Sequence, residues 1–85
     1  MNTLETELRG FVVENFLFGQ GGDTFTDEDS FLQKGIVDST GIMEVIAHLE
    51  ETYEITVEDE ELLPENLDSV ARLASFVRRK REAVG

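Results

Sequence analysis

Apolar residues recur every three or four positions in three stretches of the chain, and this spacing predicts three main helices. The first stretch runs roughly from Thr3 to Phe18 and should end at a cluster of glycines. Its regularly spaced apolar positions are Leu4, Leu8, Phe11, Val12 and Phe16. The glycines are Gly19, Gly21 and Gly22.

The second helix is predicted from about Ser39 to Tyr53, with one buried side and one polar side. The expected buried stripe consists of Ile42, Val45, Ile46, Leu49 and Tyr53. On or near the opposite face we expect Met43, Glu44, Ala47, His48, Glu50 and Glu51.

The last helix should begin near Asp68 or Ser69, since either residue could cap it. It ends in a run of cations, residues 78–81, which is favourable against the helix dipole. We interpret this run as a solubilising end. The inner face of the helix is predicted to consist of Val70, Leu73, Ala74, Phe76 and Val77.

A long connection, from about Gly19 to Asp38, carries apolar residues that predict an ordered loop pinned onto the core. These anchors are Phe25, Phe31, Leu32, Ile36 and Val37. One helical turn is expected near Asp29 to Gln33. After an extended link, Ile55 to Val57, residues 58–63 are predicted to form one or two helical turns that end at Pro64. The fold class is therefore all-α, a small four-helix bundle of three main helices and one short helix.

The chain is acidic, with 19 Asp and Glu against 7 Lys and Arg and a net charge of -12. This charge argues against a nucleic-acid partner and favours basic protein surfaces, and repulsion within it should loosen the fold at low ionic strength. Without cysteine, the side chains offer neither a disulfide nor thiol chemistry. No signal peptide and no membrane-spanning stretch is evident. We expect one domain over residues 1–85, free-standing, monomeric and cytoplasmic.

Ser39 is the main candidate for chemistry. It follows a turn glycine, an apolar pair and Asp38, and it lies where the second helix begins. The free amides and the dipole at a helix N-terminus favour a negative group, so the site suits a serine that becomes modified with a phosphate. An ordinary capping serine would explain the same position.

Catalysis by the chain itself is disfavoured, so no catalytic residue is predicted. His48 is the only histidine and follows Ser39 by nine residues. On one helix the two are separated by about 13 Å of rise and face opposite sides, whereas a nucleophile and its base must be within hydrogen-bond reach. We interpret His48 as a surface residue on the side that faces partners.

A metal site is also disfavoured. Asp23, Asp27 and Asp29 do not match the calcium-loop pattern in either register, because its glycine and closing glutamate are absent. Asp27 or Asp29 could instead cap the turn at Phe31. A further alternative is an unmodified acidic adaptor that binds a partner through the second helix.

The run from Gly35 to Ile46 resembles the phosphopantetheine attachment site of acyl carrier proteins, whose usual core is Asp-Ser-Leu before an acidic amphipathic helix. The likeness covers nearly the whole chain. It includes the Phe31-Leu32 pair, residues 49–53, the Ile55 to Val57 link and the Asp68-Ser69-Val70 start of the last helix.

The resemblance implies a carrier rather than an enzyme. A phosphopantetheinyl transferase would move 4'-phosphopantetheine from coenzyme A onto the Ser39 hydroxyl, assisted by Asp38, and the arm would carry an acyl group as a thioester. A loading ligase and downstream synthase or transferase enzymes would dock through basic patches. The implied contacts are Glu44, Glu50 and Glu51 for charge, with Thr40, Met43 and Ala47 as the apolar centre.

Two positions depart from the usual motif, because Thr40 replaces the common leucine and Gly41 replaces an acidic residue. This variant resembles carriers of D-alanine and other activated amino acids, and free-standing carriers of specialised pathways. Acyl and aminoacyl cargo therefore both remain open. The cationic end of the last helix is unusual for an acidic carrier.

Overall fold

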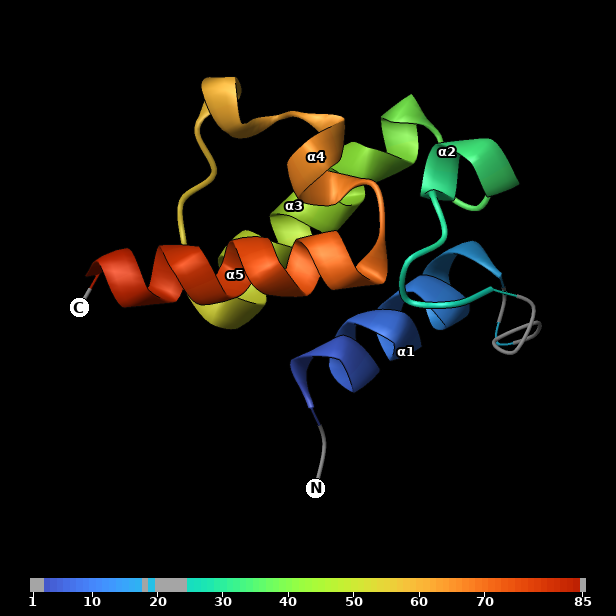
Figure 1. The fold of residues 1–85 in the computed structure, drawn as a ribbon, viewed down its shortest axis with the longest axis horizontal. Helices are drawn as coiled ribbons and strands as arrows, with labels where there is room; N and C mark the ends of the chain where they lie inside the picture. The colour runs from blue at the N-terminus through green and yellow to red at the C-terminus, as the bar shows by residue number, and fades with distance from the viewer. Residues whose placement is uncertain (1–2, 18, 20–24, 85) are drawn as a thin grey trace.

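The computed structural model describes residues 3–17, 19 and 25–84, with no account of the side chains of residues 83 and 84. Within this part the regular structure is entirely helical, which confirms the all-α prediction (Figure 1). The elements are α1 (Leu4–Phe16), α2 (Phe31–Lys34), α3 (Ser39–Tyr53), η1 (Asp59–Glu61), α4 (Pro64–Leu67) and α5 (Val70–Val84). The three long helices α1, α3 and α5 are those that the apolar spacing predicts.

The helix boundaries follow local capping. α3 has the predicted bounds, whereas α1 ends at Phe16, two residues early; Gly21 and Gly22 lie outside the described residues. Ser69 caps α5, since its hydroxyl accepts the Arg72 N–H at 3.1 Å. The short helix α2 is capped by Ser30 and not by Asp27 or Asp29, so that prediction is wrong.

Pro64 begins a helix instead of ending one. Of the predicted turns between residues 58 and 63, only the 3-10 helix η1 forms, and α4 then starts at Pro64. Proline suits the first helical position because the N–H that it lacks would have no partner there. The bundle therefore has more short elements than the single one predicted.

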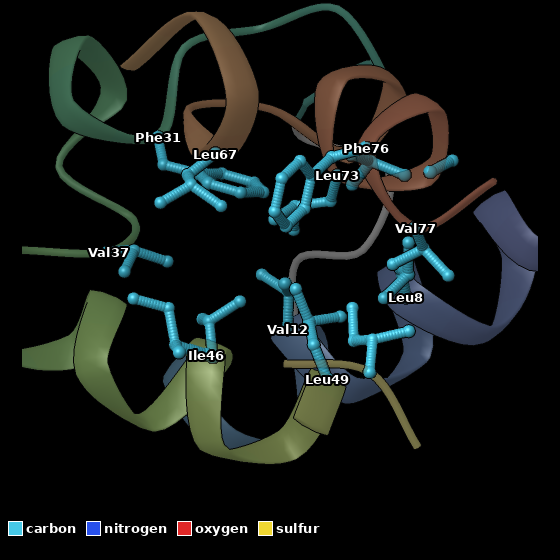
Figure 2. Packing of buried hydrophobic residues seen from close by; sticks show 14 of the residues in the cluster. Leu8, Val12, Phe31, Val37, Ile46, Leu49, Leu67, Leu73, Phe76 and Val77 are labelled. Carbon is cyan, nitrogen blue, oxygen red and sulfur yellow. The ribbon is translucent and has the colours of Figure 1, made fainter. Parts of the chain in front are cut away.

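The core lies between α1, α3 and α5, and the loop before α3 closes one end of it (Figure 2). α5 is the central element, because α1, α3 and α4 all pack against it. Phe25, Phe31 and Val37 of the loop are buried as predicted. Leu32 is the exception: its side chain is 56% exposed, so its prediction as a core anchor is wrong.

Three of the cations near the end of α5 also make specific contacts, which the interpretation as a solubilising end does not include. Arg78 donates two hydrogen bonds to the Glu5 carboxylate, at 2.7 and 2.8 Å, and these contacts hold the pKa of Glu5 below its ordinary value. Lys80 pairs with Glu61 at 2.8 Å, and Arg79 donates to Asn66 Oδ1 at 2.8 Å. The run thus ties α5 to α1 on one side and to the η1–α4 segment on the other.

Hydrogen bonds also tie the long loop to the bundle. Arg9 pairs with Asp27 at 2.7 Å, and the Asp27 carbonyl accepts the Ala71 N–H at 2.8 Å. The Asp68 carboxylate accepts from the Ser30 hydroxyl and from the Leu32 N–H. Asp29 accepts the Thr26 N–H at 2.8 Å, so Asp27 and Asp29 both have partners within the fold. Asp23 lies outside the described residues. In the part of the chain that the structure describes, no group of three acidic or histidine side chains could hold a metal ion.

Candidate functional site

Ser39 occupies the first turn of α3, and its neighbour Asp38 caps the helix. The Asp38 carboxylate accepts the Gly41 N–H at 2.6 Å, and its carbonyl accepts the Ile42 N–H at 2.9 Å. The alternative in which Ser39 is an ordinary capping residue is therefore wrong, since Asp38 has that role. Ser39 is left at the helix entrance, where the dipole favours a negative group.

The Ser39 hydroxyl is accessible. Its residue is exposed, and among the described residues none hydrogen-bonds to this hydroxyl. The other serines of the chain differ: Ser30 and Ser69 cap helices, and Ser75 lies within α5, away from any helix start. Ser39 therefore combines an unengaged hydroxyl with a helix N-terminus, which none of the other three does.

An apolar cavity of about 160 Å³ opens beside Ser39, and we call it the Ser39 pocket. The large hydrophobic side chains that are exposed in the described structure, Leu32, Met43, Leu62 and Leu63, all contribute to its lining. In Figure 2, the Phe31 and Leu67 side chains at its inner end lie together and face Ile46 of α3. The remaining lining residues are Val37, Asp38, Ser39, Ile42, Pro64 and Asp68.

The predicted contact residues lie along α3 beyond Ser39. The residues that are exposed as predicted are Thr40, Met43, Glu44, Ala47 and Glu51. Glu50 differs, because it is half-buried and its carboxylate accepts the Val57 N–H at 2.9 Å. This bond holds the link after α3 against the helix, so Glu50 has a structural role in the fold.

His48 faces α1, and its interpretation as a surface residue on the partner side is wrong. Its ring stacks on Phe11, with centroids 3.8 Å apart and planes 14° from parallel. Burial lowers the pKa of His48, with the nearby Glu51 carboxylate opposing that shift. Burial, followed by the charge of Glu7, raises the pKa of the adjacent Tyr53 to about 12. These groups belong to the packing of α1 on α3.

Gly41 shapes the entrance of α3 in a way that the sequence pattern does not reveal. A Cβ at this position would lie 2.7 Å from Phe16 Cε1 and 3.2 Å from both Asp38 Oδ1 and Val37 Cγ1. The end of α1 therefore packs against the first turn of α3 because position 41 has no side chain. The unusual glycine after Thr40 is the only sequence signal for this contact.

Replacing Gly41 with alanine is expected to lower the free energy of unfolding by about 1–3 kcal/mol, because the new methyl group overpacks the contact with Phe16. Gly10→Ala is the matched control, since it lies within α1 and its Cβ would meet nothing within 4 Å. That change should raise the free energy of unfolding by about 0.5–1 kcal/mol. Urea denaturation measures both, and an equal gain for the two variants would contradict the packing argument.

The helical bundle, with an exposed serine at a helix entrance and an apolar pocket beside it, is similar to known carrier proteins. A family model described as a phosphopantetheine attachment site matches residues 17–77, which is more than half of the chain. The fold is similar to the solution NMR structure of a holo acyl carrier protein from Nitrosomonas europaea, with a TM-score of 0.75. The two share 28% sequence identity, over 96% of this chain and 99% of that one. No sequence among the curated proteins gives a match.

The chain belongs to the phosphopantetheine-attachment family, the carrier proteins of the acyl carrier type. The resemblance inferred from the sequence is therefore confirmed, and so is its cofactor, a covalently attached 4'-phosphopantetheine. Proteins of this type are not catalysts, which confirms that the chain is not an enzyme. They work with phosphopantetheinyl transferases and with synthase enzymes. None of the described helices has the length and apolar character needed to cross a membrane.

Proposed function

We propose that Ser39 is the attachment residue and that the protein carries acyl groups on the arm as thioesters. The observation that carries this proposal is the exposed, unengaged Ser39 hydroxyl at the start of α3. A phosphate ester on that oxygen lies next to the free N–H groups of the first helical turn, which favour its charge. The arm supplies the thiol that this cysteine-free chain lacks.

Asp38 has a second role in this proposal. Its carboxylate holds the first turn of α3 through the Gly41 N–H and so fixes the backbone that bears Ser39. The same side chain is exposed beside the serine, where a transferase and its metal ion can reach it. The transferase then meets a serine whose position is set before docking, which lowers the entropy cost of the encounter.

The exposed side of α3 is the proposed docking surface for partner enzymes. Glu44 and Glu51 attract basic patches, while Thr40, Met43 and Ala47 supply the apolar contact. Rim charges of this kind raise the rate of encounter more than the lifetime of a complex, which suits a carrier that visits several enzymes. Glu50 contributes only its negative charge to this docking surface, because its carboxylate already accepts the Val57 N–H.

The pocket favours an acyl cargo over an aminoacyl one. Apart from Ser39 and Asp38 at its mouth, Asp68 is the one polar residue in its lining, and it already accepts two hydrogen bonds. The other lining residues are apolar, so a hydrocarbon chain gains by being buried against them, whereas a small charged aminoacyl group has little apolar surface to bury. We further propose that residues 1–85 form one monomeric domain that acts in the cytoplasm with a loading ligase, a synthase or a transferase.

The test is to incubate the protein with coenzyme A, magnesium and a broad-specificity phosphopantetheinyl transferase, and then to measure its intact mass. We expect the mass to rise by one phosphopantetheine group, and peptide mapping should place this group on Ser39. A mass that does not change contradicts the carrier proposal and is the result that an unmodified acidic adaptor would give.

A further inference from the structure

The cations of α5 hold one wall of the Ser39 pocket. This wall, residues 59–67, consists of η1, α4 and the two leucines between them, and it contributes Leu62, Leu63, Pro64 and Leu67 to the lining. Three side chains of α5 contact it. Lys80 Nζ lies 2.8 Å from Glu61 Oε1, Arg79 donates to Asn66 Oδ1 at 2.8 Å, and Arg72 donates to the Pro64 carbonyl at 3.2 Å.

The contacts form a connected group rather than isolated surface pairs. Glu61 Oε1 also accepts the Glu58 N–H at 2.9 Å, and Asn66 Nδ2 donates to the Glu61 carbonyl at 3.0 Å. The side chains of Lys80 and Glu61 are only 22% and 25% exposed. Such a shielded, networked pair loses less to solvent screening than an exposed one.

The side of the wall that faces α3 makes only apolar contact with the rest of the core, since Leu67 belongs to the same buried cluster as Ile46 of α3. α4 packs on α5, and in the described structure no hydrogen bond joins residues 59–67 to α3, from which the pocket separates them. The polar side-chain contacts that position this wall therefore come from the α5 side. The distance between the wall and α3 determines how much apolar cargo fits.

We propose that Arg72, Arg79 and Lys80, here called the α5 clamp, are positioning residues that limit the length of the acyl chain the pocket accepts. The inference rests on the proposed function, because it assumes cargo attached through Ser39. A dry apolar cavity of about 150 Å³ holds a benzene molecule, so a pocket of about 160 Å³ holds about six carbon atoms. Longer chains extend into solvent while the clamp is closed.

In the experiment, the phosphopantetheinyl transferase moves the acylated arm from acyl-coenzyme A to the protein, with straight acyl chains of increasing length. The Tm of each acylated form is then compared with the Tm of the form whose arm ends in a free thiol. A chain that binds inside the folded protein raises Tm, whereas carbons in solvent do not. For the wild type we expect Tm to rise up to about six carbons and then to level off.

The test variant is Arg79→Gln/Lys80→Gln, which frees the wall. We expect its Tm to keep rising beyond the chain length at which the wild type levels off, since a displaced wall leaves more volume for the chain. Amide hydrogen exchange in residues 59–67 should become faster as well. The matched control is Arg78→Gln/Arg81→Gln, which removes the same charge from α5 but breaks the contact with Glu5 of α1. In this control, Tm should level off at the same acyl-chain length as in the wild type.

A milder pair of variants serves if the double variant does not fold. Glu61→Gln removes the clamp's partner on the wall, and Glu5→Gln makes the same charge change on α1. The clamp is supported if the chain length at which Tm levels off increases in Glu61→Gln but not in Glu5→Gln. The clamp is overturned if the chain length at which Tm levels off does not change in the test variant. It is also overturned if this length increases equally in a test variant and its matched control. In either case the carrier function stands. A wild-type protein that takes up no phosphopantetheine overturns both.

Discussion

Ser39→Ala is expected to abolish the uptake of phosphopantetheine completely, because the proposed ester bond forms on the hydroxyl oxygen that this change removes. The fold should be almost unaffected. Asp38, not Ser39, caps α3, and alanine is a good helix former, so the free energy of unfolding should stay within about 0.5 kcal/mol of the wild type. Intact mass after treatment with the transferase and urea denaturation measure the two effects.

Thr40→Ala is the matched control for this experiment. It removes the neighbouring hydroxyl, which is also exposed in the first turn of α3. The variant should still gain one phosphopantetheine group. If Ser39→Ala also gains that mass, the attachment residue is not Ser39, and the proposed role of the α3 entrance is wrong.

Phe31→Ala is expected to have the largest effect on stability. Its side chain is 1% exposed, it anchors the long loop in the core, and it lines the inner end of the Ser39 pocket. Truncating a buried phenylalanine costs about 3–5 kcal/mol, because apolar burial is lost and a cavity remains. For a domain of this size that corresponds to a fall in Tm of more than about 12 °C.

The adjacent residue provides the control. Leu32 lines the same pocket, but its side chain is 56% exposed, so Leu32→Ala should change the free energy of unfolding by less than about 0.5 kcal/mol. Thermal and urea unfolding of both variants test the comparison. A loss below about 1 kcal/mol for Phe31→Ala would show that the loop is not anchored as described.

The long helices and the attachment motif were readable from the chain because their signals are local. The stripe of Val45, Ile46 and Leu49 repeats at the helical period, and its burial needs no knowledge of the partner helix. The Asp-Ser step before this helix is likewise a local signal, and it led to the family that the comparisons confirm.

The errors at His48 and Glu50 concern tertiary contacts, whereas the errors at Pro64 and at the cap of α2 concern local capping. The helical pattern places His48 on the polar side of α3, whereas its ring stacks on Phe11, which lies 37 residues earlier in the chain. Glu50 has the polarity of a surface residue, and only the return of the chain at Val57 engages its carboxylate. Proline can end a helix or begin one, and the sequence pattern does not separate the two at Pro64, which occupies the first position of α4.

By itself, the sequence indicated an acidic, all-helical carrier and predicted that the serine at the entrance of its second long helix is the modified residue. Periodicity, capping and motif spacing act over a few residues, so they can be read without coordinates. Only the tertiary structure decided that the α5 cations contact residues 59–67, that Phe16 packs against Gly41, and that a pocket of about 160 Å³ lies beside Ser39. Each of these features depends on the distance between segments far apart in the chain, which the packing of the whole bundle sets.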